Sequence, residues 1–206
     1  MGLNTMAIVA DSVLGDEQLG VLGIAPTGRA MGAEDALLVS EPEQACVVRT
    51  GTYTAIAGSL EPLMEVVESD HLDLPGTVIA ATSVSSVGFT DFCVFEDGRL
   101  RRHLCVEEDK ITMNDGEPLP EEGRFVFTSQ DEELEVDGDI LIDQVLVIAG
   151  VDAEASLFYA NGDAFAPNTV AGDESATGGQ TATRVDDSDS MEASGKKGFF
   201  RRFRRS

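Results

Sequence analysis

The sequence predicts an α+β or mixed α/β fold, with a single sheet that contains at least one antiparallel hairpin and is accompanied by two to three helices. Three observations lead to this fold class. Short runs of β-branched and apolar residues recur along the chain, two segments place apolar residues at helical spacing, and the dipeptide Asp97-Gly98 separates two strand-like runs. The pattern does not define the order of the strands.

The first third of the chain combines one clear strand with a segment that glycines interrupt. Residues 5–10 are an apolar run that ends at Asp11, which is typical of a buried strand. Between residues 12 and 44 the glycines break every candidate period, and residues 33–39 fit either a short helix or a strand. Around Gly51 the β-branched residues predict two short strands or one strand with a bulge.

A helix, a strand and a hairpin are predicted in the middle of the chain. Ser59 is expected to cap a helix that carries Pro62 in its first turn, where a missing N–H costs nothing. Residues 77–82 are the next predicted strand. Residues 91–106 predict a hairpin, because Asp97-Gly98 suits a two-residue type I′ turn.

The end of the domain is predicted to hold one more helix and one more strand. Asp139 is expected to cap a helix over residues 140–149, which Gly150 ends in a left-handed conformation. Residues 157–159 are the candidate last strand.

Charge divides the chain into three expected parts: an acidic globular domain at residues 1–162, a disordered acidic linker at 163–195 and a basic tail at 196–206. The first part holds 7 Lys and Arg against 31 Asp and Glu, the second 1 against 7 and the third 6 against none, which gives net charges of −24, −6 and +6. The linker lacks the large apolar residues that would offset the entropy of ordering. The acidic domain itself is expected to repel nucleic acid.

The three cysteines and the N-terminal segment indicate a reducing compartment, which we take to be the cytoplasm. Cys46, Cys93 and Cys105 show no paired spacing and no neighbouring His cluster, so we expect reduced thiols and no zinc site. Cys93 and Cys105 are expected about four positions apart along the hairpin ladder, roughly 13 Å, which is beyond disulfide reach. Neither a secretory signal nor a membrane-spanning helix is predicted.

Three short segments of the chain resemble uncharacterised actinobacterial proteins of unknown function. They are residues 72–81, the hairpin at 95–102 and the proline-containing loop at 116–120. The resemblance implies that such a domain recurs in other proteins. It assigns no catalytic or binding residue, because its motifs are a strand, a turn and a loop.

Two loop motifs resemble ligand-binding sequences but lack residues that those sites need. Residues 23–30 have the glycine spacing of a phosphate-binding P-loop, but Arg29 and Ala30 replace the Lys and the hydroxyl residue that contact phosphate and Mg²⁺. Residues 133–139 resemble the start of a Ca²⁺-binding loop, but Gln144 stands where a bidentate carboxylate is required. We expect a turn-rich surface loop at the first and an acidic, helix-capping turn at the second.

The other candidates for chemistry are scattered along the chain. Asp11 follows the first strand, where α/β enzymes often carry a functional carboxylate, and His71 and His103 are the two histidines. His103 would share a strand face with Cys105, but the two lie two positions apart, about 6–7 Å between their Cα atoms. The sequence predicts no catalytic residue, no metal site and no cofactor. A small cytoplasmic enzyme that uses Asp11, His71 and His103 is the runner-up hypothesis.

The tail carries the most specific functional signal. Its basic and aromatic residues are the predicted membrane- or partner-binding residues: Lys196, Lys197, Phe199, Phe200, Arg201, Arg202, Phe203, Arg204 and Arg205. On a helix the phenylalanines would fall within about 100° of one another and the arginines on the other side. This segregation is typical of a helix that lies in a membrane interface.

The sequence therefore favours a non-enzymatic accessory or scaffold domain, held peripherally at the inner face of an anionic membrane by its tail. Two other partners for the tail stay open: an acidic protein surface and the acidic domain of the same chain. The sequence predicts neither a ligand nor an oligomeric state.

Overall fold

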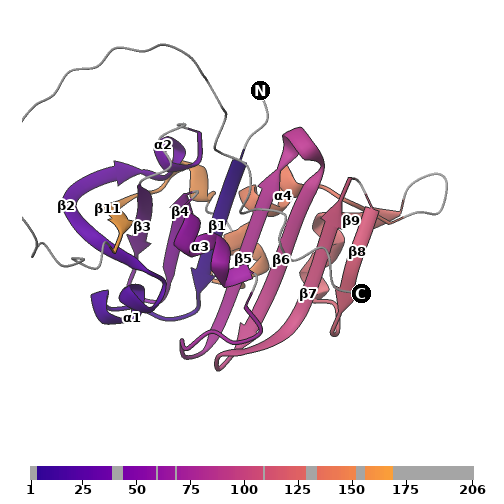
Figure 1. Cartoon of the computed structure of the whole chain (residues 1–206), viewed down its shortest axis with the longest axis horizontal. Helices are drawn as coiled ribbons and strands as arrows, with labels where there is room; N and C mark the ends of the chain where they lie inside the picture. Colours follow the sequence, from indigo (N-terminus) through magenta and orange to yellow (C-terminus); the bar gives the residue numbers. More distant parts are fainter. Residues whose placement is uncertain are drawn as a thin grey trace, which may run out of the picture. The chain divides into compact units, whose positions relative to one another are not determined.

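The protein is built on a nine-stranded sheet in which every neighbouring pair of strands is antiparallel (Figure 1). The computed structural model describes residues 4–38, 44–58, 60–67, 69–108, 110–128, 134–151 and 156–168. In spatial order the strands of the sheet are β2 (Ile24–Gly32), β11 (Asn161–Pro167), β3 (Ala45–Arg49), β4 (Thr54–Gly58), β1 (Asn4–Ala10), β5 (Thr77–Val84), β6 (Phe89–Glu96), β7 (Arg99–Glu107) and β8 (Lys110–Asp115). A separate two-stranded sheet pairs β9 (Val126–Thr128) with β10 (Leu134–Val136).

The helices are short additions to this sheet. They are α1 (Asp16–Val21), α2 (Ala33–Leu38), α3 (Glu61–Val67), α4 (Gly138–Asp143) and α5 (Val145–Ile148), with 3-10 turns at η1 (Ser85–Val87), η2 (Pro120–Arg124) and η3 (Leu157–Tyr159). The expected fold class, α+β or mixed α/β with two to three helices, is wrong. The fold is dominated by its antiparallel sheet, and each described helix spans only 4 to 7 residues.

Burial of both sheet faces explains why the fold class differs from the one that the sequence pattern predicts. On one face Ile8 packs with Leu63 of α3, and on the other Val9 packs with Leu37 of α2 and Leu141 of α4. Figure 1 shows α1 and α3 in front of the sheet and α4 behind it. A strand covered on both faces needs apolar residues throughout, so it lacks the alternation that usually marks antiparallel pairing. We call these two sides the α3 face and the α4 face.

The hairpin predicted within residues 91–106 is present as β6 and β7. Its two turn residues, Asp97 and Gly98, have φ of 47° and 79°, as a type I′ turn requires. The carbonyl of Gly98 also accepts a hydrogen bond from the N–H of Leu72 at 2.8 Å. The turn is therefore joined to the segment that leads into β5.

A β-bulge interrupts this hairpin just after the turn. Phe95 pairs with Leu100, but Val94 pairs with Arg102, so Arg101 is an extra residue in β7. An extra residue shifts the register of all that follows by one position. The bulge therefore decides which side chains of β7 face each side of the sheet.

The glycine-rich segment near the start of the chain forms a strand that the sequence did not reveal. The P-loop-like residues 23–30 were expected to form a surface loop, and instead residues 24–30 belong to β2 at the edge of the sheet. Pro26 is tolerated there because an edge strand has a free side that needs no N–H donor. Gly28, with φ of 75°, lies at the irregularity between β2 and β11.

Three predictions for the later part of the domain also change. The helix expected over residues 140–149 is divided into α4 and α5, and its cap is Asp137 rather than Asp139. The strand expected at residues 157–159 is the 3-10 turn η3.

Of the residues before α3, the expected cap Ser59 lies outside the described residues.

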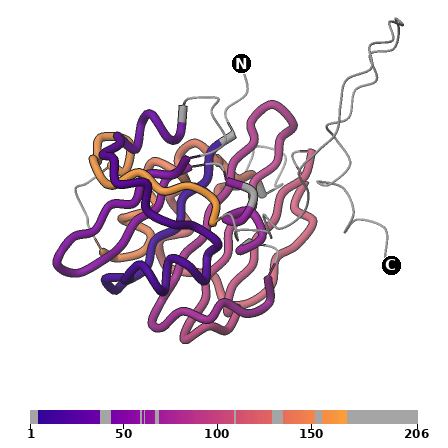
Figure 2. The backbone as a smooth tube through the Cα atoms, turned by 60° about the vertical axis from the view of Figure 1, so that its left-hand side comes forward, coloured from indigo at the N-terminus to yellow at the C-terminus, as the bar shows by residue number. Residues whose placement is uncertain are grey.

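The last described strand joins distant parts of the chain. β11 inserts between β2 and β3, and Figure 2 shows this orange segment beside the indigo and violet N-terminal part. The strand continues to Pro167, past residue 163, where the linker was expected to begin. In the described part of the chain, no helix has the length and apolar character needed to cross a membrane.

Candidate functional site

Four side chains that carry a carboxylate, an imidazole or a thiol group share the α3 face of the β6–β7 hairpin. Asp91 and Cys93 come from β6, and His103 and Cys105 come from β7. In the ladder Asp91 lies opposite Cys105, and Cys93 lies opposite His103. Directly opposed residues of an antiparallel pair point to the same face, and Cys93 belongs to the core on the α3 face. We call these four residues the β6–β7 cluster.

The bulge at Arg101 creates the cluster. In a regular hairpin closed by the same turn, His103 and Cys105 would face the side away from Cys93. The expected distance of about four ladder positions between Cys93 and Cys105 is wrong, because the observed register makes them diagonal neighbours, about 7–8 Å apart. That distance still exceeds the usual disulfide range, and none of the three cysteines forms a disulfide.

Asp91 lies at the centre of the cluster. Its Oδ1 atom lies 2.7 Å from Nε2 of His103 and 3.9 Å from Sγ of Cys93. One donor atom from each of these three residues lies within 4.8 Å of the other two. The side chains are nearly enclosed, since 13% of His103 and 9% of Asp91 remain exposed. The arrangement is a carboxylate–imidazole pair with a thiol beside it.

Burial keeps the thiols of the cluster in their neutral form. It raises the pKa of Cys105 to about 12 and also raises the pKa of Cys93, and the negative charge of Asp91 adds to both effects. Because the thiolate is the nucleophilic form of cysteine, the cluster offers no reactive thiolate at neutral pH. The pairing of Cys105 with His103 therefore lacks the chemistry of a catalytic pair.

Asp11 and His71 lie at one end of the sheet, away from the cluster. The carboxylate of Asp11 accepts a hydrogen bond from the N–H of Thr77 at 3.0 Å, so it joins the ends of β1 and β5. His71 is exposed and forms an isolated bridge with Arg99 at the start of β7. His103 is four residues further along this strand, about 10–13 Å away. The structure therefore does not bring the three residues of the runner-up hypothesis together.

A buried ion pair joins β7 to the 3-10 turn η2. Arg102 donates to both carboxylate oxygens of Glu122, at 2.8 and 2.9 Å, and to the carbonyl of Asp115 at 2.9 Å. Glu122 also accepts a hydrogen bond from the N–H of Leu119 at 2.9 Å. Exposed fractions are 3% for the Arg102 side chain and 6% for Glu122. These hydrogen bonds tie β7 to the end of β8 and to η2.

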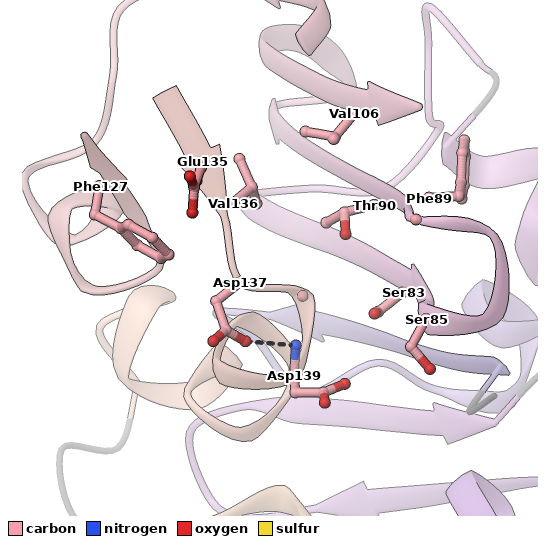
Figure 3. A pocket seen from close by; sticks show the side chains of 12 residues that line it. Ser83, Ser85, Phe89, Thr90, Val106, Phe127, Glu135, Val136, Asp137 and Asp139 are labelled. Atoms are coloured by element: carbon pink, nitrogen blue, oxygen red, sulfur yellow. Dashed lines mark hydrogen bonds between the residues drawn. The ribbon is translucent and has the colours of Figure 1, made fainter. Parts of the chain in front are cut away.

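A polar pocket of about 560 Å³ lies on the α4 face, beside the turn between β5 and β6 (Figure 3). Figure 3 shows Ser83 and Thr90 on the sheet side and Asp137 and Asp139 at the start of α4. Gly138 fits between them because a Cβ atom there would collide with the hydroxyl groups of Ser83 and Thr90. The pocket is lined mainly by hydroxyl and carboxylate groups, with Phe89, Val106, Phe127 and Val136 among the apolar residues.

The Ca²⁺-like segment forms one wall of this pocket. Its carboxylate Asp137 accepts hydrogen bonds from the N–H groups of Asp139 at 3.1 Å and Ile140 at 2.9 Å. The carboxylate is thus occupied in capping α4. The expected helix-capping turn is present, with Asp137 as the cap.

A family model described as a family of unknown function matches residues 25–140, which is more than half of the chain. The chain belongs to the DUF6928 family. The matched region contains the β6–β7 cluster, the buried ion pair and the pocket of Figure 3, and it stops short of the tail. The resemblance of residues 72–120 to proteins of unknown function agrees with this family, while an actinobacterial source is not shown. No curated protein and no solved structure matches the chain.

The predicted binding residues of the tail, at positions 196–205, lie outside the described residues. Their role in this DUF6928 protein therefore stays a prediction.

Proposed function

We propose that this DUF6928 protein is a non-enzymatic accessory domain whose tail holds it reversibly at an anionic membrane surface. The charge distribution carries the proposal. Residues 1–162 have a net charge of −24, whereas residues 196–206 have six positive charges, no negative charge and three phenylalanines. A basic segment with aromatic rings is suited to lipid phosphates and to the acyl boundary beneath them.

The energetics favour reversible binding. At about 1 kcal/mol for each basic residue near an anionic leaflet, six charges supply about 6 kcal/mol before screening. Burial of the phenylalanine rings adds a few kcal/mol more. A flexible linker of the length of residues 168–195, which follow β11, has a root-mean-square span of about 30 Å, well beyond a Debye length of about 8 Å. The repelled acidic domain therefore need not detach the tail.

The geometry of the domain supports an accessory role over the enzymatic runner-up. Asp11 is occupied at a strand end, His71 lies apart from His103, and burial raises the pKa of the cluster thiols. The candidates for catalysis thus do not converge on the pocket of Figure 3, which none of them lines.

The test measures binding of the full-length chain to vesicles of anionic or of neutral lipid. We expect binding to anionic vesicles that weakens as salt is raised, because salt screens the basic residues. Replacing Phe199, Phe200 and Phe203 by Ala should weaken binding by a few kcal/mol through lost burial. Replacing the four arginines of the tail by Gln should abolish it.

The matched control is Phe127→Ala, which removes an aromatic ring that is 45% exposed on the domain itself. This variant should bind anionic vesicles like the native chain. If the tail without phenylalanines binds as well as the native tail, the interfacial interpretation is wrong. If the native chain binds neither kind of vesicle, an acidic protein partner or the chain's own domain becomes the better interpretation.

A further inference from the structure

Three members of the β6–β7 cluster, Asp91, Cys93 and His103, have the spacing of a metal site. The whole cluster provides one carboxylate, one imidazole and two thiols, the ligand types that Zn²⁺ prefers. We propose that Asp91, Cys93 and His103 bind a thiophilic divalent cation of the Zn²⁺ type, with Cys105 as the candidate fourth ligand. The proposal does not depend on the tail or on membrane binding.

The interatomic distances suit a cation at the centre of the three ligands. Bond lengths of about 2.0–2.3 Å place neighbouring ligands of a tetrahedral Zn²⁺ about 3.3–3.8 Å apart. Oδ1 of Asp91 lies 2.7 Å from Nε2 of His103 and 3.9 Å from Sγ of Cys93, and the donor atoms of all three lie within 4.8 Å of one another. Side-chain movements of about an ångström would open the hydrogen-bonded pair and close the thiol onto the ion.

Charge favours a divalent cation in this buried position. One carboxylate, one thiolate and one neutral imidazole make a neutral assembly with a doubly charged ion, which limits the cost of burying its charge. Without a cation, the thiol of Cys93 donates a weak hydrogen bond to Oδ1 of Asp91 at 3.9 Å and so carries its proton. A bound ion would displace this proton, as metal ions do at cysteine ligands.

A buried hydroxyl beside the cluster supplies an independent observation. Thr82 of β5 lies directly opposite Asp91 in the ladder, and it is 1% exposed. Its Oγ1 atom is buried and has no hydrogen-bond partner in the described part of the chain. Such a group normally finds a partner. The Thr82 hydroxyl is placed to hydrogen-bond the carboxylate of Asp91 once that carboxylate turns from His103 toward an ion. Metal ligands commonly receive such a hydrogen bond from a neighbouring group.

The bulge gives the site its shape. Because Arg101 is inserted in β7, the Asp-x-Cys pattern of β6 and the His-x-Cys pattern of β7 face the same side. His103 is the most exposed of the three ligands, at 13%, and it marks the side from which an ion would enter.

The test titrates the full-length chain, without a purification tag, reduced and free of metal, with Co²⁺ as a spectroscopic substitute for Zn²⁺. We expect one equivalent to bind, with absorption from thiolate-to-cobalt charge transfer, and Zn²⁺ to displace it. Cys93→Ser should reduce this absorption to what Cys105 alone can supply, and His103→Gln should weaken Zn²⁺ binding by at least about 100-fold. The control is Cys46→Ser, at a buried cysteine outside the cluster whose thiol donates a hydrogen bond to the carbonyl of Met31. This variant should leave the cobalt absorption and the affinity for Zn²⁺ unchanged.

Two further measurements separate metal binding from folding. Asp91→Asn keeps nearly the same shape, so its circular dichroism should match that of the native chain while its affinity for Zn²⁺ falls. In the native chain, binding should release protons and strengthen as pH rises, because the ion displaces the thiol proton of Cys93. Charge-transfer absorption that keeps its full native strength in Cys93→Ser, or a native chain that binds no stoichiometric metal, would overturn the proposal.

Discussion

At the scale of single residues, the buried pair of Arg102 and Glu122 shows how a charge can be kept inside this domain. Removing two ions from water costs several kcal/mol each, so the pair is tolerated only because their N–H and carboxylate groups find partners. The sequence alone does not distinguish Arg102 from Arg101. In a regular hairpin Arg101 would point into the core in its place, and the bulge reverses the two.

Removing the buried guanidinium should therefore destabilise the domain strongly. Arg102→Met leaves the carboxylate of Glu122 buried without its counter-ion, and we expect a loss of about 3–5 kcal/mol in the free energy of unfolding. The control is Arg101→Met, at an exposed pair with Glu96, which should cost less than about 1 kcal/mol. Urea unfolding followed by circular dichroism measures both. Equal small losses would show that the Arg102 charge is not buried in solution.

At the scale of elements, the sequence predicts turns and fully apolar strands better than registers. Asp97-Gly98 specifies the hairpin turn through local conformational preference, and residues 5–10 and 77–82 specify strands through their apolar composition. The bulge has no such local signal, because it depends on how two strands and their cover pack together. For this reason the β6–β7 cluster could not be predicted, although its Asp-x-Cys pattern in β6 and its His-x-Cys pattern in β7 are visible in the sequence.

The hairpin turn also provides a test at this scale. Gly98 has φ of 79°, and an added Cβ would lie 2.5 Å from the carbonyl oxygen of Leu72. Gly98→Ala should therefore lower the free energy of unfolding by more than about 1 kcal/mol. Gly51→Ala, where nothing lies within 4 Å of the added carbon, should be neutral or slightly stabilising. Thermal unfolding of the two variants compares them, and similar midpoints would contradict the turn geometry.

At the scale of the whole molecule, three buried thiols link stability to pH. Burial raises the pKa of Cys46 to about 11 and of Cys105 to about 12, and it raises that of Cys93 as well. In the unfolded chain a thiol has a pKa of about 8.5. Between these values the folded protein binds more protons than the unfolded one, so stability is fully present below the unfolded pKa and is lost as pH rises.

We therefore expect the free energy of unfolding to be constant near neutral pH and to fall above about pH 8.5, by about 1 kcal/mol per pH unit for each thiol. Urea midpoints measured under reducing conditions across this range check the slope. Cys46→Ser removes one of the three thiols and should reduce the slope by its share. A midpoint that stays level up to about pH 10 would mean that the thiols ionise in the folded protein.

The position of β11 in the sheet has a consequence for synthesis on the ribosome. Among the described strands β2 pairs only with β11, and β11 separates it from β3. The edge of the sheet at β2 therefore cannot form until residue 167 has been made and released. The meander from β5 to β8 needs no such wait, because β6, β7 and β8 each pair with the strand just before them. While more than a hundred residues are being added after β2, the nascent chain carries an unpaired edge strand, the kind of surface that recruits other strands and that chaperones shield.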